Sequence, residues 1–83
     1  MAKRIPKLMQ HDSAISAIRV AVAMAPAAVG WKTGGWVVYD PRLGAPEGVE
    51  PEMLIVRQRA LPIPLSDTGA EVIRSALIAK LIG

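Results

Sequence analysis

The chain has 83 residues, with ten Lys and Arg against seven Asp and Glu, one His and no Cys. A chain of this length forms one domain, and it buries only about 60% of the surface that its unfolded form exposes. The lack of cysteine excludes a disulfide framework and a thiolate metal site, so packing or partners must stabilise the domain. The net charge of +3 permits anionic partners without indicating one.

The N-terminal residues 1–11 form a short basic arm. Its cations are Lys3, Arg4 and Lys7. The apolar run from Ala14 is similar to an export signal, but Arg19 and Pro26 interrupt it, and its longest unbroken stretch is too short to span a bilayer. We therefore expect neither an export signal nor a membrane span, and a cytoplasmic location or, for a phage-encoded chain, a place in the virion.

A helix is predicted over about residues 13–25. Asp12 and Ser13 are good N-cap residues, the alanines that follow favour helix, and Pro26 stops it. Residues 18–24 also fit a strand, because their apolar side chains alternate with Arg and Ala. The N-cap and the alanine content favour the helix, which carries more apolar surface than one packing contact uses.

An antiparallel hairpin is predicted over about residues 29–40. The two glycines at 34–35 can take positive φ at both central positions of a two-residue turn. This register places Trp31 opposite Val38. A loop rich in Gly, Pro and Glu follows the hairpin.

A third strand is predicted over about residues 52–60, where apolar and polar residues alternate most clearly. The alternation places Arg57 and Arg59 together on one face. The prolines of the following segment, residues 61–65, cannot donate hydrogen bonds to a central strand. We expect this segment to leave the sheet or to follow its edge as an exposed arm.

The last predicted element is a helix over about residues 67–82. A capping box at Thr68 and Glu71 favours this start, with Ser66 and Asp67 as competing caps. The elements together predict a small α+β domain over residues 1–83. Its small antiparallel sheet has one helix before it in sequence and one after it.

The sequence predicts no catalytic, cofactor-binding or metal-binding residues. His11 is the only histidine, so it has no second histidine or cysteine with which to form a metal site or a nucleophile–base pair. The fragment at residues 30–33 lacks the glycine spacing of a phosphate-binding loop. The carboxylates fall in predicted loops and caps, so we expect that the chain is not an enzyme.

The preferred functional hypothesis is a non-catalytic assembly or protein–protein interaction subunit that self-associates or joins a larger complex. A small structural component of a phage particle, or of a similar homo-oligomeric assembly, fits this description by analogy of composition. The hairpin and the proline-rich segment supply the candidate contact surfaces. The candidate interaction residues are Trp31, Trp36, Tyr39, Leu61, Pro62, Ile63 and Pro64.

Two alternatives stay open. One is a small nucleic-acid-binding regulator, because paired arginines on a strand and a basic arm can contact phosphates. Its candidate residues are Lys3, Arg4, Lys7, Arg57 and Arg59. The other is an inhibitor or adaptor of a host protein that docks through the hairpin.

Overall fold

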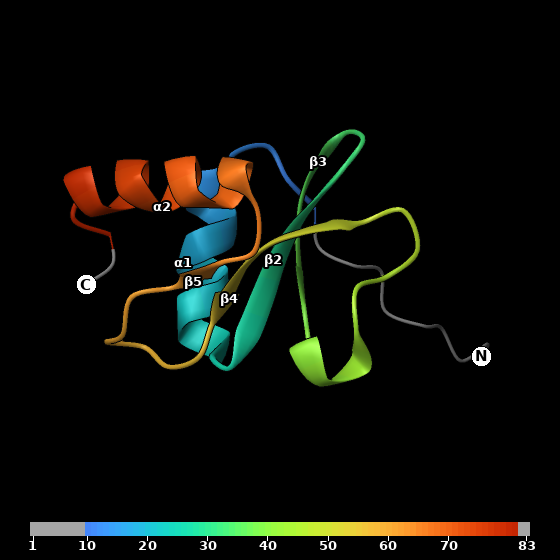
Figure 1. Cartoon of the computed structure of the whole chain (residues 1–83), viewed down its shortest axis with the longest axis horizontal. Helices are drawn as coiled ribbons and strands as arrows, with labels where there is room; N and C mark the ends of the chain where they lie inside the picture. The colour runs from blue at the N-terminus through green and yellow to red at the C-terminus, as the bar shows by residue number, and fades with distance from the viewer. Residues whose placement is uncertain (1–9, 82–83) are drawn as a thin grey trace, which may run out of the picture.

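The computed structural model describes residues 10–81, and within them two helices pack against a five-stranded antiparallel sheet (Figure 1). The strands lie in the order β1-β3-β2-β4-β5 across the sheet. The elements are β1 (Gln10–His11), α1 (Ala14–Met24), β2 (Ala27–Lys32), β3 (Gly35–Tyr39), the 3-10 helix η1 (Pro41–Leu43), β4 (Glu50–Ile55), β5 (Ile63–Pro64) and α2 (Asp67–Ile78). The predicted α+β class is confirmed.

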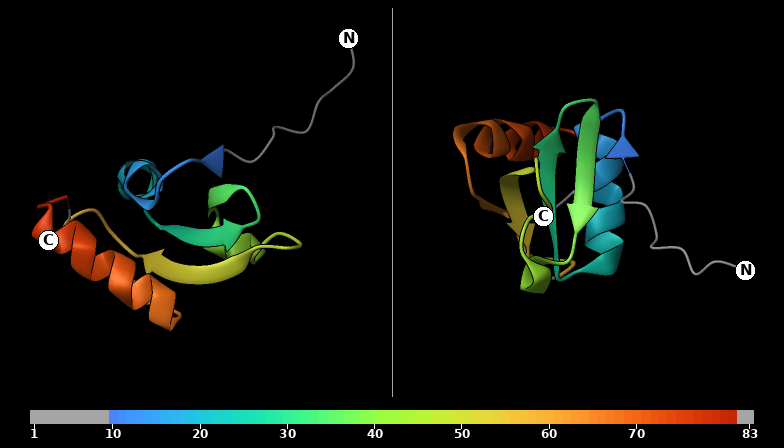
Figure 2. Two further views of the ribbon diagram at one scale, coloured as in Figure 1. Left: turned by 90° about the horizontal axis from the view of Figure 1, so that it is seen from above. Right: turned by 90° about the vertical axis from the view of Figure 1, so that its right-hand side faces the viewer.

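The two helices share one core with one face of the sheet. Helix α1 lies along β2 and β3, whereas α2 lies along β4 and β5 and crosses α1 rather than running parallel to it (Figure 2). The buried residues of this core are Ala17, Ile18, Ala21, Ala27, Val29, Val38, Met53, Ile55, Ile73 and Ala76. Many of these side chains are small, so the helices can approach the strands closely.

Helix α1 forms where the sequence predicts it, and residues 18–24 are helical rather than extended. Ser13 is the N-cap, and its hydroxyl accepts the backbone N–H of Ser16 at 3.2 Å. The helix ends before Pro26, whose preceding peptide bond is cis. The position of α1 could be predicted from local signals because the N-cap residue and the proline that ends the helix are both next to it in sequence.

The hairpin turn lies one residue earlier than predicted, so the partner of each β2 residue differs by two residues from the predicted partner. Trp31 pairs with Trp36, not with Val38, and the turn consists of Thr33 and Gly34. Gly35 belongs to β3, where a side-chain Cβ would lie 2.7 Å from the carbonyl oxygen of His11 in β1. The second glycine therefore allows the close approach of a neighbouring strand instead of forming the turn.

Strand β4 is shorter than predicted, because it ends at Ile55 rather than near residue 60. Ile55 pairs with Ala27, the first residue of β2, so the chain beyond Ile55 has no part of β2 left to pair with. Residues 57–60 form a turn instead. Two short edge strands, β1 and β5, complete the sheet, the first within the predicted basic arm and the second within the predicted proline-rich arm.

The N-terminus of α2 is joined to β4 by a small buried network. Ser66 is the N-cap, so the capping box predicted at Thr68 and Glu71 is wrong and the competing cap is correct. The Ser66 hydroxyl accepts the N–H of Gly69 at 2.8 Å and donates to the carboxylate of Glu52, which is only 6% exposed. The cap therefore also satisfies a buried acidic side chain.

Glu52 is the extra residue of a β-bulge. Strand β2 pairs Val29 with Met53 and Gly30 with Pro51, which leaves Glu52 without a partner in β2. Its carbonyl oxygen instead accepts the N–H of Leu65 at 2.9 Å. The bulge thus holds both the start of α2 and the end of the proline-rich segment against β4.

Helix α2 ends at Ile78, four residues before the predicted end. The N–H of Leu81 donates a hydrogen bond to the carbonyl oxygen of Ala76 at 2.9 Å. The N–H of Lys80 donates to the carbonyl oxygen of Leu77 at 3.0 Å, and the two bonds together form a Schellman motif. Lys80 has φ 61° at the left-handed position of this motif. Leu81 packs against the core, so burial of its side chain favours ending the helix there.

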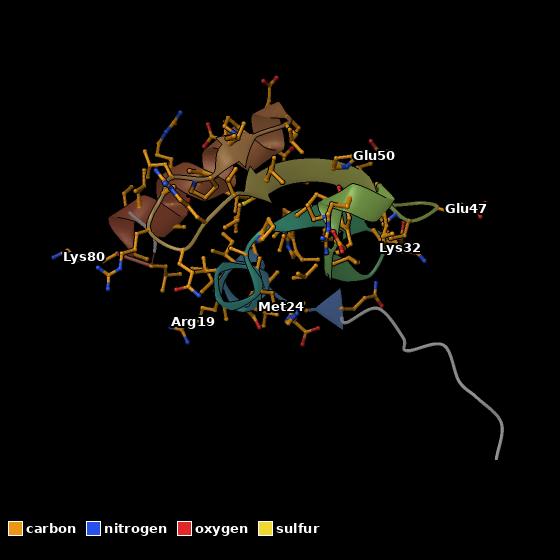
Figure 3. All side chains as sticks on the ribbon, turned by 90° about the horizontal axis from the view of Figure 1, so that it is seen from below. Arg19, Met24, Lys32, Glu47, Glu50 and Lys80 are labelled. Atoms are coloured by element: carbon orange, nitrogen blue, oxygen red, sulfur yellow. The ribbon has the colours of Figure 1, made fainter. Side chains whose placement is uncertain are left out.

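Replacing Lys80 with glycine is expected to stabilise the domain by about 1 kcal/mol, because a side chain at a left-handed position is strained and glycine is not. The Lys80 side chain extends into solvent, so the substitution removes little packing (Figure 3). Urea unfolding followed by circular dichroism measures the change. Ala79→Gly, at a right-handed position, is the control and should lower stability. If Lys80→Gly and the parent are equally stable, the backbone of Lys80 is not strained in its left-handed conformation.

Candidate interaction surface

The candidate interaction residues fall in two separate places. Trp31, Trp36 and Tyr39 lie on the β2–β3 hairpin, whereas residues 61–64 lie at one edge of the sheet, separated from the hairpin by β4. The two sets therefore do not form one surface.

The two tryptophans form a cross-strand pair near the hairpin tip. Their ring centroids are 5.2 Å apart in an edge-to-face arrangement. Trp36 is partly buried against the core, and Trp31 is 40% exposed. Much of the surface of Trp36 thus contributes to packing, and only Trp31 offers a large area to a partner.

Tyr39 is buried on the sheet face opposite the helices. It clusters there with Ala28, Val37 and Val49, and its ring would lie 3.3 Å from a Cβ added to Gly30. Burial raises the pKa of its hydroxyl above the usual value. Tyr39 is therefore a packing residue of the second face rather than an accessible contact.

Residues 63–64 of the proline-rich segment form the edge strand β5, and most of the segment is exposed. Ile63 pairs with Leu54, which packs against the cluster of the second sheet face. Leu61 and Leu65 flank β5 on either side and are exposed like Ile63, while Pro62 between Leu61 and Ile63 is buried. Leu61, Ile63 and Leu65 are 55%, 47% and 49% exposed, and we call these three residues the apolar ridge.

The prolines of this segment alternate with the ridge. Pro62 is buried, whereas Pro64 is exposed although it pairs with Met53, a residue of the helix-side core. Of the two predicted alternatives, leaving the sheet or following its edge, the segment follows the edge, and four of its five residues are exposed. The ridge is held in place by the sheet and does not hang free.

The outer edge of β5 lacks backbone donors. The bond from the N–H of Leu65 to Glu52, together with antiparallel alternation, directs the backbone of Ile63 towards β4. The backbone groups of Pro62 and Pro64 then face outwards, and proline has no N–H. This edge presents carbonyl acceptors alone, which disfavours the addition of another strand.

Leu65 of the ridge and Val56 are exposed apolar residues that were not among the residues proposed from the sequence. Val56 follows Leu54 by two residues, and Leu65 follows Ile63 by two residues. The alternation of large apolar residues with prolines over residues 61–65 was enough to include Leu65 with Leu61 and Ile63. For Val56, the signal was its position two residues after Leu54 within the predicted strand of residues 52–60.

The arginines of the nucleic-acid alternative do not lie on a strand face. Arg57 and Arg59 are exposed in the turn that follows β4, so the shared-face geometry predicted for them is wrong. The other candidates, Lys3, Arg4 and Lys7, lie outside the described residues.

Several polar residues that the sequence offered for chemistry have structural partners. Arg42 donates to the carboxylate of Asp40 through its side chain and its backbone, and these bonds lower the pKa of Asp40. Glu71 lies 3.3 Å from Arg74 in α2. The Nδ1 atom of His11 lies 2.9 Å from the Ser16 hydroxyl, at the start of α1.

Comparison with known protein families, with curated proteins and with solved structures found no match. Within residues 10–81, no helix is long and apolar enough to cross a membrane. The same residues contain no group of three or more His, Asp or Glu side chains that could hold a metal ion.

Proposed function

We propose that this chain is a non-catalytic assembly subunit that associates with further copies of itself and buries the apolar ridge in the contact. The observation that carries the proposal is the set of three large apolar side chains, Leu61, Ile63 and Leu65, each about half exposed in or beside the edge strand β5. Contiguous apolar surface of this kind marks interaction sites on soluble domains.

The ridge is also well ordered for binding. The backbone bond from Leu65 to Glu52, the pairing of β5 with β4 and the burial of Pro62 hold the backbone of the ridge against the sheet before any partner binds. A preorganised surface loses little conformational entropy on association, so more of the hydrophobic gain becomes affinity. Such a subunit suits a homo-oligomeric particle, including a phage particle.

Changing Ile63 to Asp is expected to weaken self-association at least about 100-fold. Each copy would lose the burial of one large apolar side chain and place a charge in the contact. Sedimentation velocity over a concentration series, with circular dichroism to verify folding, measures the effect. Because Ile63 is 47% exposed in the single chain, the fold should tolerate the change.

Leu43→Asp is the matched control, since Leu43 is 85% exposed in η1 and lies far from the ridge in sequence and in the sheet order. It should associate like the parent. A parent chain that stays monomeric at all concentrations would refute the proposed function. Equal weakening by both substitutions would show that the ridge is not the contact.

A further inference from the structure

The ridge is flanked in sequence by opposite charges. Arg59 precedes Leu61 by two residues, in the turn that leads into the ridge, and Asp67 follows Leu65 by two residues, in the first turn of α2. Both side chains are exposed. Ile63 is the midpoint of this series in sequence, with a leucine on each side and a charge beyond each leucine.

We infer, on the basis of the proposed function, that the occupant of the ridge is a second copy in antiparallel orientation. A two-fold axis at Ile63 places the two Ile63 side chains against each other and Leu61 of each copy against Leu65 of the other. Arg59 of each copy then faces Asp67 of the other copy. The series is thus self-complementary in both hydrophobicity and charge, as a two-fold interface requires.

The two end charges are available for this contact. Within residues 10–81 the ion pairs join Arg42 to Asp40 and Arg74 to Glu71, and neither involves Arg59 or Asp67. Two exposed charges that flank an apolar surface form a polar rim, as is typical of protein interfaces. Such rim pairs add modest affinity and fix the orientation of the partner.

The backbone of β5 restricts which contacts two copies can form. Joining the β5 edges would bring the carbonyls of Pro62 and Pro64 in one copy against the same acceptors in the other, with no N–H from either proline. Continuous sheet formation is therefore disfavoured, and the copies meet through their ridge side chains. The contact closes on itself, so it produces dimers rather than an open fibre.

A charge-reversal mixing experiment tests the pairing. Arg59→Asp alone places like charges at both ends of the dimer, and Asp67→Arg alone does the same with the opposite sign. Each variant should associate about tenfold more weakly than the parent. An equimolar mixture should recover parental affinity, because each end of the mixed dimer again pairs Arg with Asp. Sedimentation velocity and native mass spectrometry measure the recovery.

Arg19→Asp is the control, because it changes the same charge on an exposed position of α1 that projects away from the sheet (Figure 3). It should associate like the parent, and its mixed dimer with Asp67→Arg should stay weaker than the parental dimer, because one end of that mixed dimer still places Arg against Arg. If Asp67→Arg loses its helical signal, Asp67→Asn replaces it. Arg59→Asp should then bind Asp67→Asn more tightly than either variant binds itself.

Two results would overturn the antiparallel pairing while leaving the proposed function in place. One result is that the parent self-associates through Ile63, and that Arg59→Asp and Asp67→Arg are folded and associate as tightly as the parent. The other is a mixture that stays as weak as its components. A monomeric parent would instead remove the proposed function itself, so the two failures are distinguishable.

Discussion

Replacing Gly69 with alanine is expected to destabilise the domain by about 3 kcal/mol or more. Alanine is normally the better helix residue by about 1 kcal/mol, so helix propensity alone predicts the opposite sign. In α2, however, a Cβ at this position would lie 2.7 Å from the carbonyl carbon of Glu52 and closer still to its oxygen. Backbone atoms cannot move aside as a flexible side chain can, so α2 would have to shift from β4.

Equilibrium unfolding in urea measures the effect of Gly69→Ala, and Thr68→Ala is the matched control. Thr68 is the preceding helical residue and is exposed, so its replacement should change stability by no more than about 0.5 kcal/mol. A Gly69→Ala variant as stable as the parent would show that α2 does not lie so close to β4. Because α2 and the ridge are both anchored at Glu52, the variant should also weaken self-association.

Replacing Ser66 with alanine is expected to cost about 3 kcal/mol. Loss of the N-cap removes the acceptor for the N–H of Gly69, which costs about 1 kcal/mol. The same change removes the donor to the buried carboxylate of Glu52, and an unsatisfied buried acceptor costs about a further 2 kcal/mol. The measurement is the free energy of unfolding in urea at neutral pH.

Ser13→Ala provides the comparison, because Ser13 caps α1 with the same geometry but at an exposed site without a carboxylate partner. It should cost about 1 kcal/mol. In a Glu52→Gln background, the cost of Ser66→Ala should fall towards that value, because the buried charge is gone. Additive effects of Ser66→Ala and Glu52→Gln would contradict the proposed coupling between the hydroxyl and the carboxylate.

The fold class was predictable because its signals are local. The cap at Ser13, the stop at Pro26 and the alanine-rich segment between them specify α1 without reference to the rest of the chain. The paired glycines at 34–35 similarly indicate a reversal of the chain. Helix α2 begins where one of the competing caps placed it, at Ser66.

The details that were wrong depend on contacts between segments far apart in sequence. Gly35 could not be assigned to β3 without β1 lying against it, and the end of β4 depends on where β2 begins. Among the competing caps, Ser66 is the one that also reaches Glu52. Local patterns contain no information about these neighbours.

The candidate site was predictable in its location but not in its geometry. The sequence pointed to residues 61–64, and the structure assigns Leu61 and Ile63 to the exposed side and Pro62 to the buried side. It also places Tyr39 in a packed cluster, away from solvent. Which residues of the proline-rich segment face outwards depends on the strand and helix that pack against it.

By itself, the amino-acid sequence determined the class of fold, the approximate position of each helix and of the hairpin, and the presence of more apolar surface than a small core uses. These follow from caps, turns and periodicity, which act over a few residues. The tertiary structure alone decided the strand register, the bulge at Glu52 and the direction of the ridge. Close packing of distant segments determines these features, because only one arrangement satisfies their backbone hydrogen bonds and volumes together.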